Sequence, residues 1–222
     1  MKRVYLSWSS GKDSAWALGL LLAAPAVEVV GLVTTVNRTH GRVAMHAVRE
    51  ELLQRQAEAV GLPLVVLDLP WPCPDGVYEE VMREFVLGAV AAGVTHMAFG
   101  DLFLEDIRAY REERLAGTGL QALFPLWGAD TQALATAMTA PDTGLECYLT
   151  CVDPKQVPGS FAGRRYDRAL LAELPEGVDP CGENGEFHTF VTRAPGFASP
   201  LAVVVGAVVE RDGFTYADLL PG

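Results

Sequence analysis

Short apolar runs alternate with longer segments of helical period through the first 130 residues of the chain. This alternation is typical of a parallel sheet wrapped by crossover helices. Strands are expected at residues 4–8, 27–36, 64–69, 95–99 and 120–127. Helices are expected at residues 14–23, 44–60, 77–92 and 105–115. Glycines at 61 and 93 follow two of these helices, where a helix commonly ends.

The pattern changes after Gly128. Helices are expected at residues 130–138 and 165–174, separated by a strand at 145–152 and a Pro/Gly-rich stretch. Three more strands are expected at residues 187–192, 201–210 and 214–217, the last two joined by an Arg-Asp-Gly turn. We therefore predict two lobes, an α/β domain over residues 1–130 and a smaller α+β lobe over residues 131–222.

The charge composition of the chain argues against some classes of binding partner. The 222 residues include 28 acidic and 17 basic side chains, a net charge of −11. Binding to nucleic acid or to an anionic membrane needs a dense field of Lys and Arg, so neither is expected. The apolar N-terminal segment imitates a signal peptide, but Gly11, Lys12 and Asp13 interrupt it. We expect a cytoplasmic protein without a membrane span.

The four cysteines form no CxxC pair and are too scattered for a disulfide framework, which favours a reducing compartment. Cys147 and Cys151 lie four residues apart on a predicted strand, so they share a face. We expect a buried pair, with a redox or metal role as the alternative.

The segment of residues 9–14 reads Ser-Ser-Gly-Lys-Asp-Ser and lies between the first strand and the first helix. Backbone N–H groups at a helix start attract anions, and Gly11 permits close approach of the backbone. Lys12 adds a positive charge suited to phosphate, and hydroxyl donors come from Ser9, Ser10 and Ser14. The segment predicts a phosphate site; the alternative is a plain helix cap by Asp13 or Ser14. It is not a Walker A loop, which has Ser or Thr where Asp13 stands.

A second polar cluster, residues 181–189, reads Cys-Gly-Glu-Asn-Gly-Glu-Phe-His-Thr and precedes a predicted strand. Its two glycines allow a tight turn. Glu183 and Glu186 have three candidate roles: they can bind an amine-bearing or cationic substrate, hold Mg²⁺ or act as a base. The alternative is a turn without chemistry.

Residues 9–14 resemble the Ser-Gly-Gly-x-Asp-Ser loop of the PP-loop ATP pyrophosphatases, with Ser10 in place of the first Gly. The resemblance implies a HUP-like, adenine nucleotide alpha hydrolase-like fold, a five-stranded parallel sheet in the order 3-2-1-4-5. It also implies that ATP is cleaved between its α and β phosphates while the loop holds the pyrophosphate. Ligands bind where the strand order reverses, here between the first and fourth strands.

This fold implies further contacts at the carboxyl ends of the strands. Gly100 would allow close approach of ATP, and Asp101 would reach Mg²⁺ or the incoming nucleophile, unless it only caps the next helix. Thr34 and Thr35 would lie beside the adenine and form backbone hydrogen bonds to its edge. His46 would reach the phosphates, unless it is a surface or packing residue. The residues expected to act in catalysis are Lys12, Asp13 and Asp101, with Asp13 and Asp101 as metal ligands.

Residues 183–189 resemble the Glu-Gly-Gly-Glu-Tyr/Phe-Glu-Thr motif of the diphthine–ammonia ligase branch of these proteins. Asn184 and His188 depart from that motif. The resemblance covers essentially the whole chain and implies a substrate site formed by Glu183, Asn184, Gly185, Glu186 and His188. Because His188 replaces a carboxylate, it removes a negative charge and changes which acceptor is favoured.

The resulting hypothesis is ATP-dependent amide formation through an acyl-adenylate, with ATP and Mg²⁺ as cofactors. The acceptor would be a small molecule or a protein side chain, used together with ammonia. Two alternatives remain, transfer of sulfur to RNA and binding of an adenine nucleotide without catalysis. The sequence names neither the acceptor nor the oligomeric state, and a homodimer is left open.

Overall fold

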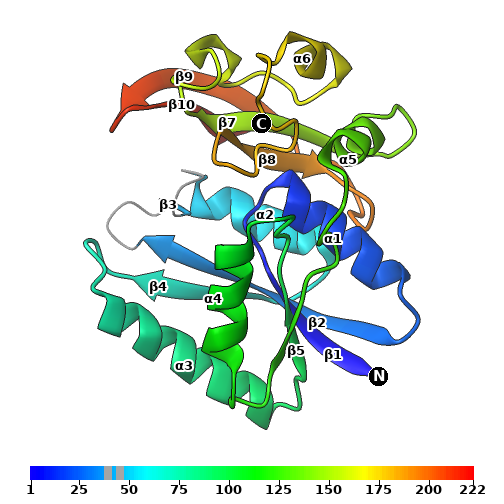
Figure 1. Cartoon of the computed structure of the whole chain (residues 1–222), viewed down its shortest axis with the longest axis vertical. Helices are drawn as coiled ribbons and strands as arrows, with labels where there is room; N and C mark the ends of the chain where they lie inside the picture. Colours follow the sequence, from blue (N-terminus) through cyan, green and yellow to red (C-terminus); the bar gives the residue numbers. More distant parts are fainter. Residues whose placement is uncertain (38–41, 44–47) are drawn as a thin grey trace.

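The computed structural model describes residues 1–37, 42–43 and 48–222. His46, predicted to contact phosphate, lies outside the described residues. Two β-sheets stack one above the other, with helices around the larger sheet and shorter helices beside the smaller one (Figure 1).

The larger sheet confirms the predicted strand order. Its five parallel strands run β4-β2-β1-β5-β6, which is 3-2-1-4-5 in order of appearance. A short strand β3 pairs antiparallel with β2. The bounds are β1 (Lys2–Ser7), β2 (Val27–Asn37), β3 (Arg42–Val43), β4 (Leu64–Leu69), β5 (His96–Ala98) and β6 (Gln121–Leu123). The reversal of strand order therefore lies between β1 and β5, where ligands bind in such folds.

Helices cover both faces of this sheet. On one face, α1 (Lys12–Ala23) and α2 (Glu50–Val60) pack Leu18 and Leu52 against the buried Leu6 of β1. On the other face, α3 (Asp75–Ala91) and α4 (Glu105–Leu115) close a second apolar cluster that contains Val86 and Phe99. Alternating burial along β1 supplies both clusters, because neighbouring side chains of a strand point to opposite faces.

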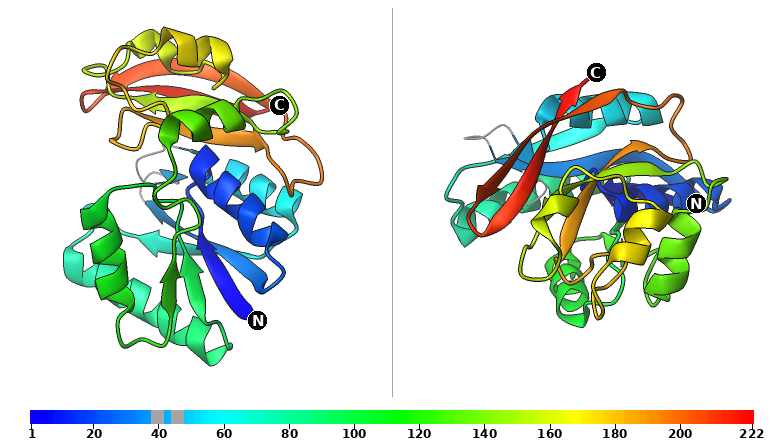
Figure 2. Two further views of the ribbon diagram at one scale, coloured as in Figure 1. Left: turned by 45° about the vertical axis from the view of Figure 1, so that its right-hand side comes forward. Right: turned by 90° about the horizontal axis from the view of Figure 1, so that it is seen from above.

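The smaller sheet is antiparallel, in the order β8-β7-β10-β9. It covers the end of the larger sheet at which the parallel strands finish (Figures 1 and 2). The bounds are α5 (Thr131–Met138), β7 (Glu146–Val152), η1 (Gly159–Phe161), α6 (Arg168–Glu173), β8 (Phe187–Arg193), β9 (Val203–Arg211) and β10 (Phe214–Pro221).

Helix α1 lies between the two sheets (Figure 2). Leu18 of α1 is fully buried in one continuous cluster with Leu6 of the first sheet and Leu149 and Phe190 of the second. A helix packed on opposite sides is apolar around most of its circumference. Burying one such side chain contributes about 1.5–3 kcal/mol, so α1 joins the two sheets firmly.

Several boundaries differ from the predictions. Helix α2 begins at Glu50, so residues 48–49 are not helical, and residues 44–47 lie outside the described part. Helix α6 begins at Arg168 because the Asp167 carboxylate caps it, accepting from Leu170 N at 2.9 Å. Strand β6 has three residues, shorter than predicted, and β10 continues to Pro221.

The predicted turn and cap glycines are confirmed. Gly61 ends α2 in the left-handed region with φ 72°, and Gly213 has φ 83° in the β9–β10 turn. Cys147 and Cys151 are both buried on β7 and carry free thiols, which confirms the predicted burial. The predicted shared face is not kept, because the pairing with β8 shifts register before Cys151, and the main apolar cluster contains Cys147 and Val152 but not Cys151. Within the described part of the chain, no helix is long and apolar enough to cross a membrane.

Candidate active site

The loop between β1 and α1 is held in an unusual backbone conformation. Ser10 has φ 70°, in the left-handed region that favours glycine. Its carbonyl accepts a hydrogen bond from Val191 N of β8 at 2.9 Å and another from Gln56 Nε2 of α2 at 3.1 Å. Gln56 is fully buried and also accepts from Trp8 Nε1 at 2.8 Å. Both lobes therefore fix the loop.

The hydroxyl groups of the loop have different environments. Ser9 Oγ lies 3.1 Å from Ser14 Oγ, which donates to Gly11 O at 2.9 Å. Ser10 Oγ is buried and has no hydrogen-bond partner among the described residues. Gly11 is the cap residue of α1, so neither Asp13 nor Ser14 occupies that position. Ser10 Oγ leaves the loop with an unused buried donor.

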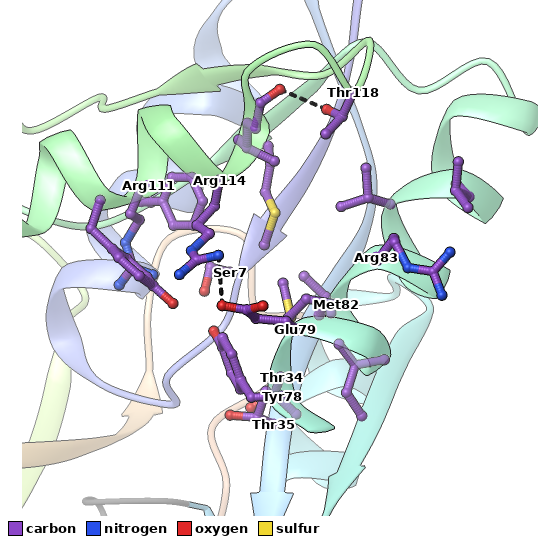
Figure 3. A pocket seen from close by; sticks show the side chains of 18 of the residues that line it. Ser7, Thr34, Thr35, Tyr78, Glu79, Met82, Arg83, Arg111, Arg114 and Thr118 are labelled. Carbon is purple, nitrogen blue, oxygen red and sulfur yellow. Dashed lines mark hydrogen bonds and ion pairs between the residues drawn. The ribbon is translucent and has the colours of Figure 1, made fainter. Parts of the chain in front are cut away.

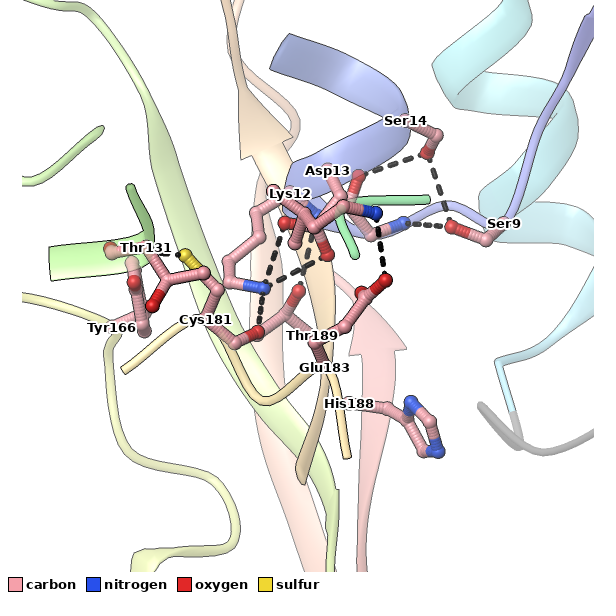
Figure 4. Close-up of polar contacts among 12 residues, drawn as sticks. Ser9, Lys12, Asp13, Ser14, Thr131, Tyr166, Cys181, Glu183, His188 and Thr189 are labelled. Carbon is pink, nitrogen blue, oxygen red and sulfur yellow. Dashed lines mark hydrogen bonds and ion pairs between the residues drawn. The ribbon is translucent and has the colours of Figure 1, made fainter. Parts of the chain in front are cut away.

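Lys12 lies deep between the lobes rather than at the mouth of the loop (Figure 4). Its ammonium donates to both Asp13 carboxylate oxygens, at 2.9 and 3.0 Å, and to the Cys181 carbonyl. The rings of Tyr166 and Phe187 each lie 5.6 Å from Nζ. Burial, the largest single effect, lowers the pKa of Lys12, but the charge and hydrogen bonds of Asp13 together with the two nearby cysteines leave the pKa raised. Lys12 therefore remains charged, and it fastens the second lobe to the start of α1.

Strand β8 packs directly against the loop. Lys12 N donates to Thr189 Oγ1 at 3.0 Å. A Cβ atom on Gly11 would lie 3.2 Å from the Thr189 carbonyl, so the close approach that glycine permits here is that of β8. Gly100 plays the same role at the end of β5, where a Cβ would lie 3.0 Å from Ser14 N. The two glycines bring the loop, β5 and β8 together.

Glu183 comes from the second lobe, and its carboxylate reaches the segment that follows β5. Its Oε1 accepts from Leu102 N at 2.7 Å. Burial raises the pKa of Glu183 to about 7 against the lowering effect of this hydrogen bond, and the charges of Asp13 and Asp101 also raise it. A carboxylate that titrates near neutral pH, beside a loop at a helix start, is suited to proton transfer.

Asp101 lies at the expected edge but is already paired. Arg111 Nε of α4 donates to Asp101 Oδ2 at 2.8 Å, and the guanidinium stacks 4.5 Å from the Phe99 ring. Helix α4 has Leu104 as its cap residue, so the alternative that Asp101 caps this helix is wrong. No three His, Cys, Asp or Glu side chains converge into a metal site within residues 1–37, 42–43 and 48–222.

The remaining residues of the second polar cluster are divided between two places. Glu186 is buried in the turn, where its Oε1 accepts from Asp179 N and Asn184 Nδ2, each at 3.0 Å. Gly185 has φ 82° and completes this turn. His188 is partly exposed and points away from Lys12 (Figure 4). The structure thus brings Glu183 to the loop but uses Glu186 inside the turn.

A cavity of about 740 Å³ opens beside the loop, between α3, α4 and the sheet (Figure 3). Ser7 and Ser9 line it near the loop, and Thr34 and Thr35 line it from β2. Its volume is within the range of roughly 300–1,000 Å³ typical of small-molecule sites. The predicted adenine residues therefore border a cavity at the strand-order reversal.

The second-lobe cysteines near Lys12 lie in surroundings that disfavour a thiolate. Cys147 and Cys181 are both buried, and burial raises the pKa of each thiol to about 12. A thiol with such a pKa stays protonated at neutral pH and is a poor nucleophile.

Two contacts were missed from the sequence: the grip of Gln56 on the loop and the pairing of Arg111 with Asp101. The helical period of α2 indicates only that Gln56 lies on a packing face, and a cation near the C-terminus of α4 is already explained by the helix dipole.

The fold and the site together define a two-lobed α/β protein with a HUP-like sheet, in which a second lobe closes over the loop that follows the first strand. The chain belongs to the diphthamide synthase family. The family model of the N-terminal domain matches residues 1–121, and that of the C-terminal domain matches residues 132–215. The chain is also similar to a diphthine–ammonia ligase of Danio rerio, with 28% identity over 230 residues, covering 88% of this chain and 84% of that protein.

Proposed function

We propose that the protein is an ATP-dependent ligase that forms an amide through an acyl-adenylate and releases AMP and pyrophosphate. The observation that carries the proposal is that two polar groups lie beyond the ends of β1 and β5, the strands that flank the strand-order reversal. Ser10 offers a buried hydroxyl without a partner at the start of α1, and Glu183 reaches the same edge from the second lobe. Membership of the diphthamide synthase family supports the same chemistry.

The reaction has two steps. A carboxylate oxygen of the acceptor attacks the α-phosphorus of ATP, the bond between that phosphorus and the bridging oxygen breaks, and pyrophosphate leaves with the electron pair. Ammonia then attacks the acyl carbon, the acyl–phosphate bond breaks, and AMP leaves. One proton is lost from nitrogen as the amide forms. Charge develops on the leaving phosphates, where fixed hydrogen-bond donors contribute most to catalysis.

The loop would bind the departing pyrophosphate. Ser10 Oγ is the clearest donor because it is buried and unused. Ser9 and Ser14 shape the loop, and the start of α1 adds its positive dipole. Lys12 would act from a distance, because its ammonium is held by Asp13 and Cys181. Thr34, Thr35 and Gly100 would border the nucleoside and the α-phosphate.

Glu183 would take the proton that nitrogen loses. With a pKa of about 7 it is substantially ionised at neutral pH and can accept a proton without binding it too tightly. The 2.7 Å hydrogen bond from Leu102 N holds one carboxylate oxygen at the end of β5, which leaves the other for the substrate. The buried Glu186 would support the turn from which Glu183 projects.

The loop would hold the polyphosphate together with Mg²⁺ as its counter-ion. Mg²⁺ is commonly bound by one or two carboxylates together with phosphate oxygens and water. Asp13 and Asp101 would hold it, although each is paired with a side-chain cation here. When bound, Mg²⁺ would neutralise charge on the phosphates.

The acceptor is proposed as a carboxylate used together with ammonia. The similar Danio rerio protein is named for diphthine and ammonia. His188 replaces a carboxylate of the motif and is partly exposed, so the second lobe of this chain would carry less negative charge. Sulfur transfer is disfavoured, because the cysteines nearest the loop have pKa values of about 12.

The test is the fate of α-labelled ATP with ammonium and a carboxylate acceptor. The proposal predicts AMP and pyrophosphate in equal amounts, and a Ser10→Ala variant that is severely impaired. The matched control is Ser199→Ala, which removes an exposed hydroxyl outside the site. Formation of ADP, or binding of ATP without turnover, would contradict the proposed ligase.

A further inference from the structure

The cavity beside the loop extends well past the residues expected to meet the nucleotide. Beyond Thr34 and Thr35 it runs between α3 and α4 as far as Gly117 and Thr118 (Figure 3). Apolar side chains form much of this extension. They include Met82, Val86 and Leu87 of α3, Phe99 and Leu115. The extension can therefore bind the apolar part of a ligand.

Three arginines line this part of the cavity. Arg83, Arg111 and Arg114 are each paired with one carboxylate, at 3.7, 2.8 and 2.7 Å. A guanidinium has five N–H donors, more than a single carboxylate uses, so a paired arginine can also donate to an anionic ligand.

Two of the guanidinium groups are held in place by aromatic rings. Arg111 stacks on Phe99 at 4.5 Å, and Arg114 stacks on Tyr110 at 5.1 Å. Arg114 NH1 also lies 2.7 Å from Glu79 Oε1, an ion pair that joins α4 to α3 across the cavity (Figure 3). Because these groups are already ordered, less side-chain freedom is lost when they meet an anion.

We propose that the α3–α4 part of the cavity binds the acceptor, a molecule with an apolar body and at least one anionic group recognised by Arg111 and Arg114. The assignment rests on the proposed function, because that reaction must hold a carboxylate beside ATP. Arg111 is bonded to Asp101, at the same strand end as the loop. An anionic group bound by the two arginines would therefore lie close to the loop that holds the phosphates. Adenine is uncharged, so it cannot supply this anionic group.

The test uses two fluorescent dyes that differ by one charge. 8-Anilino-1-naphthalenesulfonate is an aromatic anion, and N-phenyl-1-naphthylamine is the same framework without the sulfonate. An Arg111→Ala/Arg114→Ala double variant should bind the anionic dye about tenfold more weakly, because hydrogen bonds to charged groups are lost. Its binding of the neutral dye should change less than twofold.

The matched control is Arg108→Ala. Arg108 is on the same helix, but it stacks on Trp127 at 4.7 Å and does not line the cavity. This variant should bind both dyes as the unaltered protein does. Equal losses for the two dyes in the double variant, or no loss for the anionic dye, would overturn the assignment.

Nucleotide binding is measured in the same samples by calorimetry with α,β-methylene-ATP. We expect the analogue to bind the unaltered protein without displacing the anionic dye, because acceptor and ATP must be bound together. Displacement would assign the whole cavity to the nucleotide and overturn the inference while leaving the proposed function intact. Failure of the unaltered protein to bind the analogue would instead overturn the proposed function, and with it the acceptor role.

Discussion

Ser10 should lower the free energy of unfolding and, in return, donate a hydrogen bond to the bound nucleotide. Its φ of 70° costs a non-glycine residue about 1–2 kcal/mol, and a buried hydroxyl without a partner costs about 1–3 kcal/mol. Ser10→Ala removes the hydroxyl and keeps the backbone strain, so the free energy of unfolding should rise by about 1 kcal/mol. Ser10→Gly removes both costs but adds roughly 0.5–1 kcal/mol of unfolded-state entropy, for a net gain of about 1–2 kcal/mol.

The affinity for nucleotide should change in the opposite direction. If Ser10 Oγ donates to a phosphate, both variants lose a hydrogen bond to a charged group, worth about 1.5–3 kcal/mol or at least roughly tenfold in affinity. Urea unfolding followed by circular dichroism gives the stability, and calorimetry with α,β-methylene-ATP gives the affinity. The reasoning is refuted if Ser10→Ala is destabilised by about 1 kcal/mol or more, or if it binds the analogue as tightly as the unaltered protein.

The other predictions concern three residues around the loop, Glu183, Lys12 and Gln56. The acceptor-dependent rate should rise with pH through a midpoint near 7 as Glu183 loses its proton, and a pH–rate profile of Glu183→Gln that kept this rise would exclude Glu183 as the base. Because its folded pKa is raised above 4.5, Glu183 costs stability progressively from about pH 4.5 to 7, a loss that Glu183→Gln should remove in unfolding titrations. Lys12→Ala should lower the free energy of unfolding by about 2–4 kcal/mol, because it leaves Asp13 without its cation. Adding Asp13→Asn should restore part of this stability. A Lys12→Ala variant as stable as the unaltered protein would contradict the role of the buried pair. Gln56→Leu should cost about 3 kcal/mol in thermal unfolding by leaving Trp8 Nε1 and the Val191 carbonyl without partners, and an unchanged melting temperature would count against that role.

The sheet and the position of the loop were predictable because they depend on local patterns. Apolar strands alternating with helices specify a parallel sheet, and the polar segment at residues 9–14 directly follows the first strand. Gly100 and Asp101 could be placed at the neighbouring strand end for the same reason. The strand order that places them beside the loop was implied by the resemblance to the PP-loop proteins, and the rule for strand-order reversals then located the site.

The environment of Lys12 could not be predicted in the same way. A lysine at a helix start indicates phosphate binding when only the helix is considered. Lys12 N donates a hydrogen bond to Thr189 Oγ1, and these two residues are 177 positions apart in the sequence. This bond shows that β8 covers the start of the helix. The ammonium is therefore turned towards Asp13 and Cys181. One signal in the sequence indicated this covering. The apolar residues of α1 extend around more of the helix than the single stripe expected when only one side is packed.

The two glutamates of the second cluster show a similar limit. Their spacing is compatible with a shared role, but the left-handed Gly185 turns the chain between them. Glu186 then faces Asp179 N inside the turn, while Glu183 projects towards Leu102. Side chains three residues apart in a turn do not share a direction unless the turn is known, so sequence spacing did not separate their roles.

The central claim is that the polyphosphate of ATP binds against the loop between β1 and α1. A crystal structure grown with α,β-methylene-ATP and Mg²⁺ tests it most directly. We predict the β- and γ-phosphates within hydrogen-bond distance of Ser10 Oγ, with the adenine beside Thr34 and Thr35. Density for the analogue elsewhere, with Ser10 Oγ still lacking a partner, would contradict the account.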